Sequence, residues 1–286
     1  MRRLLLAAAA ALAVSGAARA QPPVWVVRDA DSEMLIFGSV HLLPPGLSWR
    51  PAALDAALRG ADDLWFELPV GPAADQETAR LAAATGLLPP DKSLFRLLPQ
   101  KDAERLARVA MAYGVDRAVL DRMEPWLAEV ALAGGAYRKA GADTRHGVEQ
   151  VLNAAAGAGI RREALETPAE QIALFDDATF ADQLASLAQT VRELEEDPQG
   201  FMALVRAWLA GDTDRLEREA LVPLRKASPR LYERLVTGRN ARWARRLDAR
   251  LKGKGRTVVV VGVGHLIGTD GLPARLRALG YSVRGP

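Results

Sequence analysis

The sequence predicts an α/β fold: a central mixed, largely parallel sheet flanked by helices, with a helix-rich middle segment between strand-rich N- and C-terminal parts. β-rich runs lie near both ends of the 286-residue chain, and the last of them, TVVVV, places five β-branched residues in succession. Between the ends, from about residue 75 to 252, apolar residues recur at three- and four-residue spacing, as in amphipathic helices. One domain over residues 21–286 therefore suits the pattern.

The first twenty residues read as a signal peptide. Arg2 and Arg3 precede an apolar run from Leu4 to Val14, and Ala18-Arg19-Ala20 is a small-x-small cleavage signal, so we expect cleavage after Ala20. A periplasmic or secreted protein follows from this leader. No later stretch is apolar for the 20 or so residues that a membrane helix needs, so no integral membrane segment is expected after cleavage.

The N-terminal part predicts a hairpin, a helix and a further strand. Residues 24–28 and 34–41 are β-rich and are separated by the turn-forming Asp29-Ala30-Asp31-Ser32. Helical spacing follows over 51–61, where Pro51 suits a first turn, and 64–70 returns to a strand pattern.

The middle is helical with one short interruption. Helical patterns extend from Asp75 to Gly141 in several pieces divided by Gly or Pro. Further helices are predicted at residues 147–157, 168–197, 201–210, 214–221 and 229–251, and a short strand at 162–166.

The C-terminal part predicts a buried strand, a helix and an edge strand. Residues 257–263 are apolar enough for a central strand that is covered on both faces. A short helix is predicted at 271–279 and a closing edge strand at 281–284.

Charge and composition exclude several classes of protein. The formal charge is +3, but Arg2, Arg3 and Arg19 of the leader account for all of it, and the remainder is neutral. The basic residues from Arg239 to Arg256 are interleaved with an acid on a predicted helix, which favours a solvated helix face over a nucleic-acid site. The chain has no cysteine, which excludes disulfides and a cysteine nucleophile, and it contains no G-x-S-x-G, H-E-x-x-H, P-loop or dinucleotide motif.

Two matched histidine motifs are the main functional signal. Gly38-Ser39-Val40-His41 follows the strand pattern MLIF, and Gly262-Val263-Gly264-His265 follows TVVVV. If the two strands are parallel neighbours, both imidazoles project into the crevice at their carboxyl ends, where α/β proteins bind ligands. Each histidine alone fits a strand-end hydrogen bond, but the matched pair favours a metal site or a histidine base.

Two further segments supply candidate partners. Glu67 interrupts the apolar run LWFELP, and it fits a metal ligand or general base, or alternatively a half-buried surface glutamate. In GRNARW, Arg239 and Asn240 could donate hydrogen bonds to a substrate, but their spacing favours a charged helix face whose Trp243 packs into the core.

These motifs together resemble the bacterial TraB/GumN family. The resemblance rests on GSVHLLP, FELP, RNxxW and VGVGHLIGTDGLPARLRALGYSV and spans nearly the whole mature chain. The animal TIKI proteins, metalloproteases that act on Wnt ligands, are similar in their paired Gly-x-x-His motifs. The resemblance implies an α/β fold akin to erythromycin esterase and the haem-binding ChaN proteins, with a divalent metal, Mn, Co or Zn, near the paired histidines.

The resemblance also implies roles for single residues. His41, His265 and Glu67 would hold the metal and act in catalysis, Arg239 and Asn240 would support them, and Gly38 and Gly262 would be their backbone companions. The roles of Glu149 and Glu166 stay open because their segments depart from the family pattern, and His146 fits a surface histidine.

Three functions follow from these observations. The first is an exported metal-dependent hydrolase, a peptidase by the family resemblance, in which Glu67 moves a proton to and from a metal-bound water. The second is a peptide- or haem-binding protein that performs no chemistry. The third is a metal-free esterase with a histidine base. A peptide or small-molecule substrate suits both enzyme hypotheses, and nothing in the sequence identifies it or the oligomeric state.

Overall fold

The computed structural model describes residues 21–286, so the predicted leader lies outside the described part of the chain. Six strands form one sheet in the order β4-β3-β5-β2-β1-β6. They are β1 (Val24–Arg28), β2 (Ser32–Ser39), β3 (Asp63–Phe66), β4 (Arg161–Ala164), β5 (Gly255–Gly262) and β6 (Ser282–Arg284). Strands β4, β3, β5 and β2 run parallel, whereas β1 is antiparallel to β2 and β6. The predicted mixed, largely parallel sheet is confirmed.

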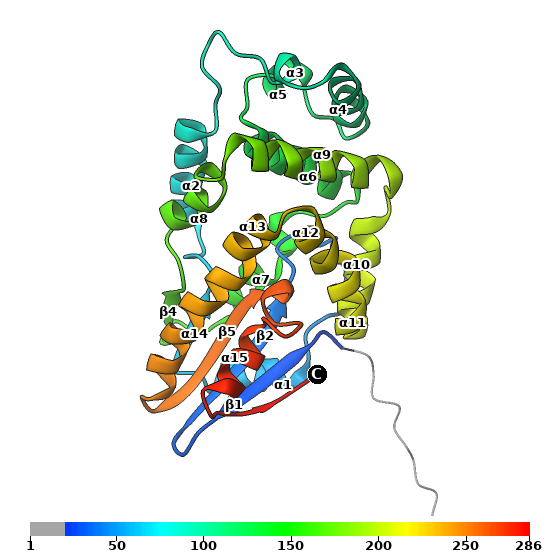
Figure 1. Ribbon diagram of the computed structural model, residues 1–286. Helices are drawn as coiled ribbons and strands as arrows, with labels where there is room; N and C mark the ends of the chain where they lie inside the picture. Colours follow the sequence, from blue (N-terminus) through cyan, green and yellow to red (C-terminus); the bar gives the residue numbers. More distant parts are fainter. Residues whose placement is uncertain (1–20) are drawn as a thin grey trace, which may run out of the picture.

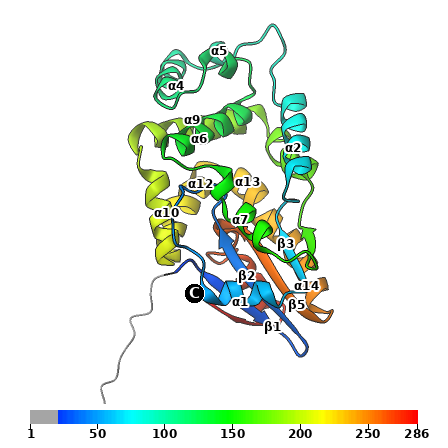
Figure 2. The same cartoon turned by 180° about the vertical axis from the view of Figure 1, so that it is seen from behind.

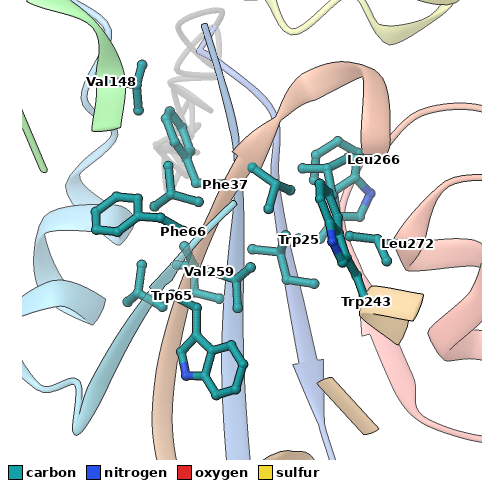
Figure 3. Close-up of a cluster of buried hydrophobic side chains, with 14 of the residues drawn as sticks. Trp25, Phe37, Trp65, Phe66, Val148, Trp243, Val259, Leu266 and Leu272 are labelled. Atoms are coloured by element: carbon teal, nitrogen blue, oxygen red, sulfur yellow. The ribbon is translucent and has the colours of Figure 1, made fainter. Parts of the chain in front are cut away.

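Apolar side chains on both faces of the central strands build the main core. Val258 to Val261 of β5 and Ile36 and Phe37 of β2 are almost fully buried. Figure 3 shows Phe37, Phe66 and Val148 on one side of these strands and Leu266 and Leu272 on the other. Burial on both faces is what a run of β-branched residues favours.

Helices cover the two faces of the sheet. Helices α1 (Ala52–Arg59) and α7 (Val148–Ala155) lie on one face, and α14 (Gly238–Leu251) and α15 (Leu272–Ala278) on the other (Figures 1 and 2). Each buries an apolar stripe, such as Leu54 and Leu58 of α1, against the strands.

The remaining helices lie mostly beyond the carboxyl ends of the parallel strands (Figure 1). They are α2 (Pro72–Thr85), α3 (Leu94–Leu97), α4 (Gln100–Ala112), α5 (Arg117–Leu120), α6 (Pro125–Lys139), α8 (Pro168–Asp176), α9 (Phe180–Glu196), α10 (Gly200–Ala210), α11 (Thr213–Leu216), α12 (Val222–Ala227) and α13 (Pro229–Tyr232). Several of them share a second hydrophobic cluster, which includes Leu106, Leu132 and Leu187. None of the helices in the described part of the chain is long and apolar enough to cross a membrane.

Four short helical turns complete the described structure, and one of them contains His265. Turns η1 (Thr144–His146) and η4 (Val263–His265) are 3-10 helical, and η2 (Glu217–Leu221) and η3 (Glu233–Thr237) are π-helical. The π turns interrupt the helices predicted at 214–221 and 229–251. Such turns are rare, depend on tertiary packing and often occur at functional sites.

Several predicted elements were too long, among them the following two. The strand predicted at 64–70 ends at Phe66, so Glu67 lies just beyond the strand instead of within it. The helix predicted at 168–197 is two helices, because Thr179 begins α9 by accepting a hydrogen bond from the backbone of Asp182.

Candidate functional site

The two histidine motifs lie side by side at the ends of neighbouring parallel strands. Strand β2 pairs with β5 in a register that places Gly38 opposite Val261 and Ser39 opposite Gly262. His41 follows the end of β2 by two residues, and His265 belongs to the turn that follows β5. The predicted neighbouring arrangement of the two strands is therefore confirmed.

Gly262 marks the point where three of the predicted site residues meet. A Cβ atom added to Gly262 would lie 3.1 Å from Oε1 of Glu67, 3.6 Å from Nε2 of His41 and 3.8 Å from Cδ2 of His265. Gly38 allows the turn after β5 to pack closely against β2, because a Cβ at Gly38 would lie 2.9 Å from Cγ2 of Val263. The missing side chains let the strand ends and the three polar groups approach one another.

His41 is anchored through one ring nitrogen. Its Nδ1 lies 2.7 Å from Oε1 of Glu149, which also accepts a hydrogen bond from Oγ of Ser39 at 2.5 Å. Glu149 stands in the first turn of α7, whose preceding Gly147 packs against the backbone carbonyl of His41. The other ring nitrogen, Nε2, lies on the side of Gly262, 3.6 Å from the position of a Cβ atom there, and 57% of the His41 side chain is exposed.

The charge of Glu149 dominates the titration of His41. It raises the pKa of His41 to about 9, against the opposing effect of burial. The pKa of Glu149 itself is lowered, because its attraction to His41 and its hydrogen bonds outweigh burial. At neutral pH the pair is an imidazolium and a carboxylate.

Arg239 is the centre of a buried network on the other side of the site. Its Nη2 donates to Oε2 of Glu67 at 2.6 Å, and its Nε donates to both carboxylate oxygens of Glu166 at 3.0 and 3.1 Å. Its Nη1 lies 3.0 Å from Nε2 of His265, and its guanidinium stacks over the ring of Trp243 at 4.5 Å. Trp243 in turn donates from Nε1 to Glu166 at 3.0 Å. All five side chains are buried.

Glu67 is held in its ionised form. Oε1 accepts a hydrogen bond from the backbone N–H of Gly262 at 2.6 Å, and Oε2 accepts the one from Arg239. Burial raises the pKa of Glu67, but the charge of Arg239, with smaller effects from His265, His41 and the hydrogen bond from Gly262, outweighs it and brings the pKa to about 2. A carboxylate with so low a pKa is a weak base near neutral pH, so this environment favours a fixed charge over the proton shuttle that the sequence suggested.

His265 is held neutral in a single tautomer. Asn240 donates through Nδ2 to the carbonyl oxygens of His265 and Asp270, so its Oδ1 faces Nδ1 of His265 at 2.7 Å. Nδ1 therefore carries the ring proton, and Nε2 accepts from Arg239. Burial, reinforced by Arg239 and opposed by Glu67, lowers the pKa of His265 to about 3.

Comparison with known proteins agrees with the motifs. The sequence profile of the TraB/PrgY/gumN family matches residues 23–285. The chain belongs to the TraB/PrgY/gumN family. Among its relatives, the Escherichia coli (strain K12) protein described as "Uncharacterized protein YbaP" is 25% identical over 258 residues, which cover 90% of this chain and 92% of that protein. The protein of the same description from Shigella flexneri matches to the same extent. No solved structure gives a significant match.

The divalent metal that this family resemblance implied does not fit the side chains as they are placed. Both ring nitrogens of His265 and both oxygens of Glu67 already have partners, and the guanidinium of Arg239 lies between these two residues, where a shared cation would sit. Over residues 21–286, no group of three or more His, Cys, Asp or Glu side chains is arranged to hold a metal ion.

In this TraB/PrgY/gumN chain, Arg239 and Asn240 lie in an environment that differs from the one their spacing predicted. The prediction of a charged, exposed helix face was wrong here, because Arg239 is 7% exposed and Asn240 is fully buried. The helix turns this part of its polar face toward Glu67 and His265, while Arg242 stays half-exposed. Spacing alone does not show which polar face has buried partners; the RNxxW motif was the signal that did.

Two acidic residues complete the networks that the motifs began. Glu149 anchors His41, and Glu166 anchors Arg239, although their segments depart in part from the family pattern. Neither could be assigned from spacing, since each approaches the site from a separate element. His146 bonds Asp143 instead and takes no part in either network.

Proposed function

We propose that this protein is a hydrolase of ester or amide bonds that uses His41 as its general base and Glu149 as the residue that orients it. One observation carries the proposal: Nδ1 of His41 is fixed by a carboxylate while Nε2 faces the point shared with Glu67 and Gly262. A base held by a third group, with its other nitrogen toward the reacting atoms, is the arrangement that activates a nucleophile. The predicted leader supports a site of action outside the cytoplasm.

The reaction can be written with the residues of this site. A water molecule between Nε2 of His41 and Oε1 of Glu67 gives a proton to Nε2 as its oxygen attacks the substrate carbonyl carbon. The tetrahedral intermediate collapses, the bond to the leaving group breaks, and His41 returns the proton to that alcohol or amine. Water is consumed, and a carboxylic acid and an alcohol or amine leave.

The buried network has a positioning role in this scheme. Arg239 fixes Oε2 of Glu67, and the backbone N–H of Gly262 fixes Oε1, so Glu67 keeps its charge and its place. His265 accepts from Arg239 and is itself held by Asn240. These contacts orient the carboxylate that accepts the second hydrogen bond of the water.

Turnover of p-nitrophenyl acetate by the purified, chelator-dialysed protein tests the proposal. We expect His41→Gln to lower kcat/KM by about 10²- to 10⁴-fold, the usual contribution of a general base, and His146→Gln to leave it unchanged. Because the base acts only when deprotonated, kcat/KM should rise with pH toward the pKa of about 9. Equal turnover by the His41→Gln protein would contradict the proposal.

A metal-dependent peptidase is the second candidate, and the meeting of His41, Glu67 and His265 around Gly262 favours it. Such a site requires Arg239 to withdraw from Glu67 and His265. Two measurements distinguish the two candidates: metal analysis of the purified protein, and turnover before and after treatment with a chelator. Turnover that is lost on chelation and restored by Mn²⁺, Co²⁺ or Zn²⁺ would favour the metal enzyme, whereas binding of peptide or haem with no turnover would favour a sequestering protein.

A further inference from the structure

An apolar pocket opens beside the candidate base. Its volume is about 250 Å³, and His41, Gly262 and Gly264 form the wall nearest the catalytic groups. The opposite wall comes from α6, α10 and the π-helical turn η2, through Tyr137, Leu204 and Ala220. Larger hollows lie near Trp49 and Arg59, away from Glu67 and Gly262.

The lining of this pocket selects against charge. Apart from His41, no lining side chain is ionised near neutral pH, and most are aliphatic or aromatic. Tyr137 and Phe201 place their rings 4.5 Å apart along it, and burial raises the pKa of the Tyr137 hydroxyl. A charged group entering here would lose its hydration without a partner, whereas an apolar group gains by leaving water.

The size of the pocket sets the size of its occupant. A cavity of about 150 Å³ is enough for benzene, so a larger apolar pocket of this kind takes a chain of roughly six carbons or a ring with a short linker. The absence of side chains at Gly262 and Gly264 leaves the route from this pocket to His41 open.

We propose that this pocket binds an uncharged apolar group on the acyl side of the substrate, of about six carbons, and so places the scissile carbonyl beside Nε2 of His41. This inference rests on the proposed function, because it takes His41 as the base. It names the substrate class as acyl compounds with a medium-length aliphatic or aromatic group next to the carbonyl.

The first test measures kcat/KM for p-nitrophenyl acetate, butyrate, hexanoate and dodecanoate. We expect a rise of about two- to fourfold for each methylene up to hexanoate, the gain from burying a methylene group, and no further rise at dodecanoate. Ala220→Phe should fill the pocket and reduce the ratio of hexanoate to acetate turnover at least fivefold. Ala83→Phe, on the exposed face of α2, is the matched control and should leave the ratio unchanged.

The second test measures binding without turnover. In an NMR titration, hexanamide should bind the wild-type and Ala83→Phe proteins equally, and Ala220→Phe should weaken its binding. Leu204→Gln, which adds a polar group to the same wall, serves as a second variant if Ala220→Phe does not fold by circular dichroism. Acyl turnover without a chain-length preference, with hexanamide binding unchanged in the folded pocket variant, overturns this inference and leaves the proposed function standing. Hexanamide binding that Ala220→Phe weakens, in a protein without any acyl turnover, supports the pocket and contradicts the proposed function.

Discussion

Replacing Glu149 by glutamine should move the titration of His41 to lower pH. The substitution keeps the size of the side chain and removes the charge that is the largest cause of the raised pKa, which is about 9 in place of the ordinary 6.5. Because 57% of the His41 side chain is exposed, water screens part of this interaction, and we expect a decrease of about one to two pH units instead of a complete return.

The assay is NMR of the imidazole Cε1–H groups between about pH 5 and 10. The chain has only three histidines, so His41→Gln and His146→Gln assign the resonances. His41 should titrate near pH 9 in the wild-type protein and lower in Glu149→Gln, while His265, with a pKa of about 3, should not titrate in this range. A wild-type His41 that titrates at its ordinary pKa, or one that Glu149→Gln does not change, would refute the assigned pairing.

The same pair makes a stability prediction whose sign is fixed by the direction of the shift. A raised folded-state pKa stabilises the fold fully below the unfolded pKa of 6.5, and this contribution disappears as pH rises through about 9. Glu149→Gln should therefore lower the free energy of unfolding near pH 6, by about 1.4 kcal/mol for each pH unit by which it moves the titration of His41, and have no such effect near pH 10.

Two further substitutions test the packing of the site by urea denaturation. Arg239→Met leaves two buried carboxylates without their shared cation and should destabilise the protein by about 3–5 kcal/mol. Arg242 is half-exposed, so Arg242→Met should destabilise the protein by less than about 1 kcal/mol. Similar losses of stability in the two variants would mean that the buried network contributes little. Gly147→Ala would place a Cβ 2.0 Å from the carbonyl oxygen of His41 and should lower the free energy of unfolding by about 1–3 kcal/mol. Gly157→Ala, whose Cβ meets nothing within 4 Å, should leave stability unchanged. A Gly147→Ala protein of wild-type stability would disprove the contact with His41.

The strand-rich ends were predictable because local sequence determines them. A run such as TVVVV favours a strand buried on both faces, and a glycine followed three residues later by a histidine marks the end of each of two such strands. The parallel pairing of β2 with β5 then brings His41 and His265 to one edge of the sheet. The meeting of the two motifs thus followed from pattern and topology.

The partners of those histidines were not predictable in the same way. Glu149 and Glu166 reach the site from α7 and from the segment after β4, and no periodicity states which carboxylate on a helix or loop is buried. The face of α14 that carries Arg239 reads as solvated because its charges are regularly spaced. Only tertiary packing decides that this arginine faces two carboxylates instead of water.

The two motifs are alike in sequence but differ in what they allow their histidines to do. His41 is partly exposed, has the Glu149 carboxylate at Nδ1 and has Nε2 on the side of Gly262, so it can gain and lose a proton. His265 is buried in the turn after β5 with both nitrogens engaged, and its low pKa keeps it neutral. The element that approaches each strand end makes the difference: α7 brings a carboxylate to one, and α14 brings Arg239 and Asn240 to the other. Repetition of a motif therefore yields here a division between one histidine that is able to titrate, as the proposed base must, and one that accepts a hydrogen bond from the guanidinium that fixes Glu67.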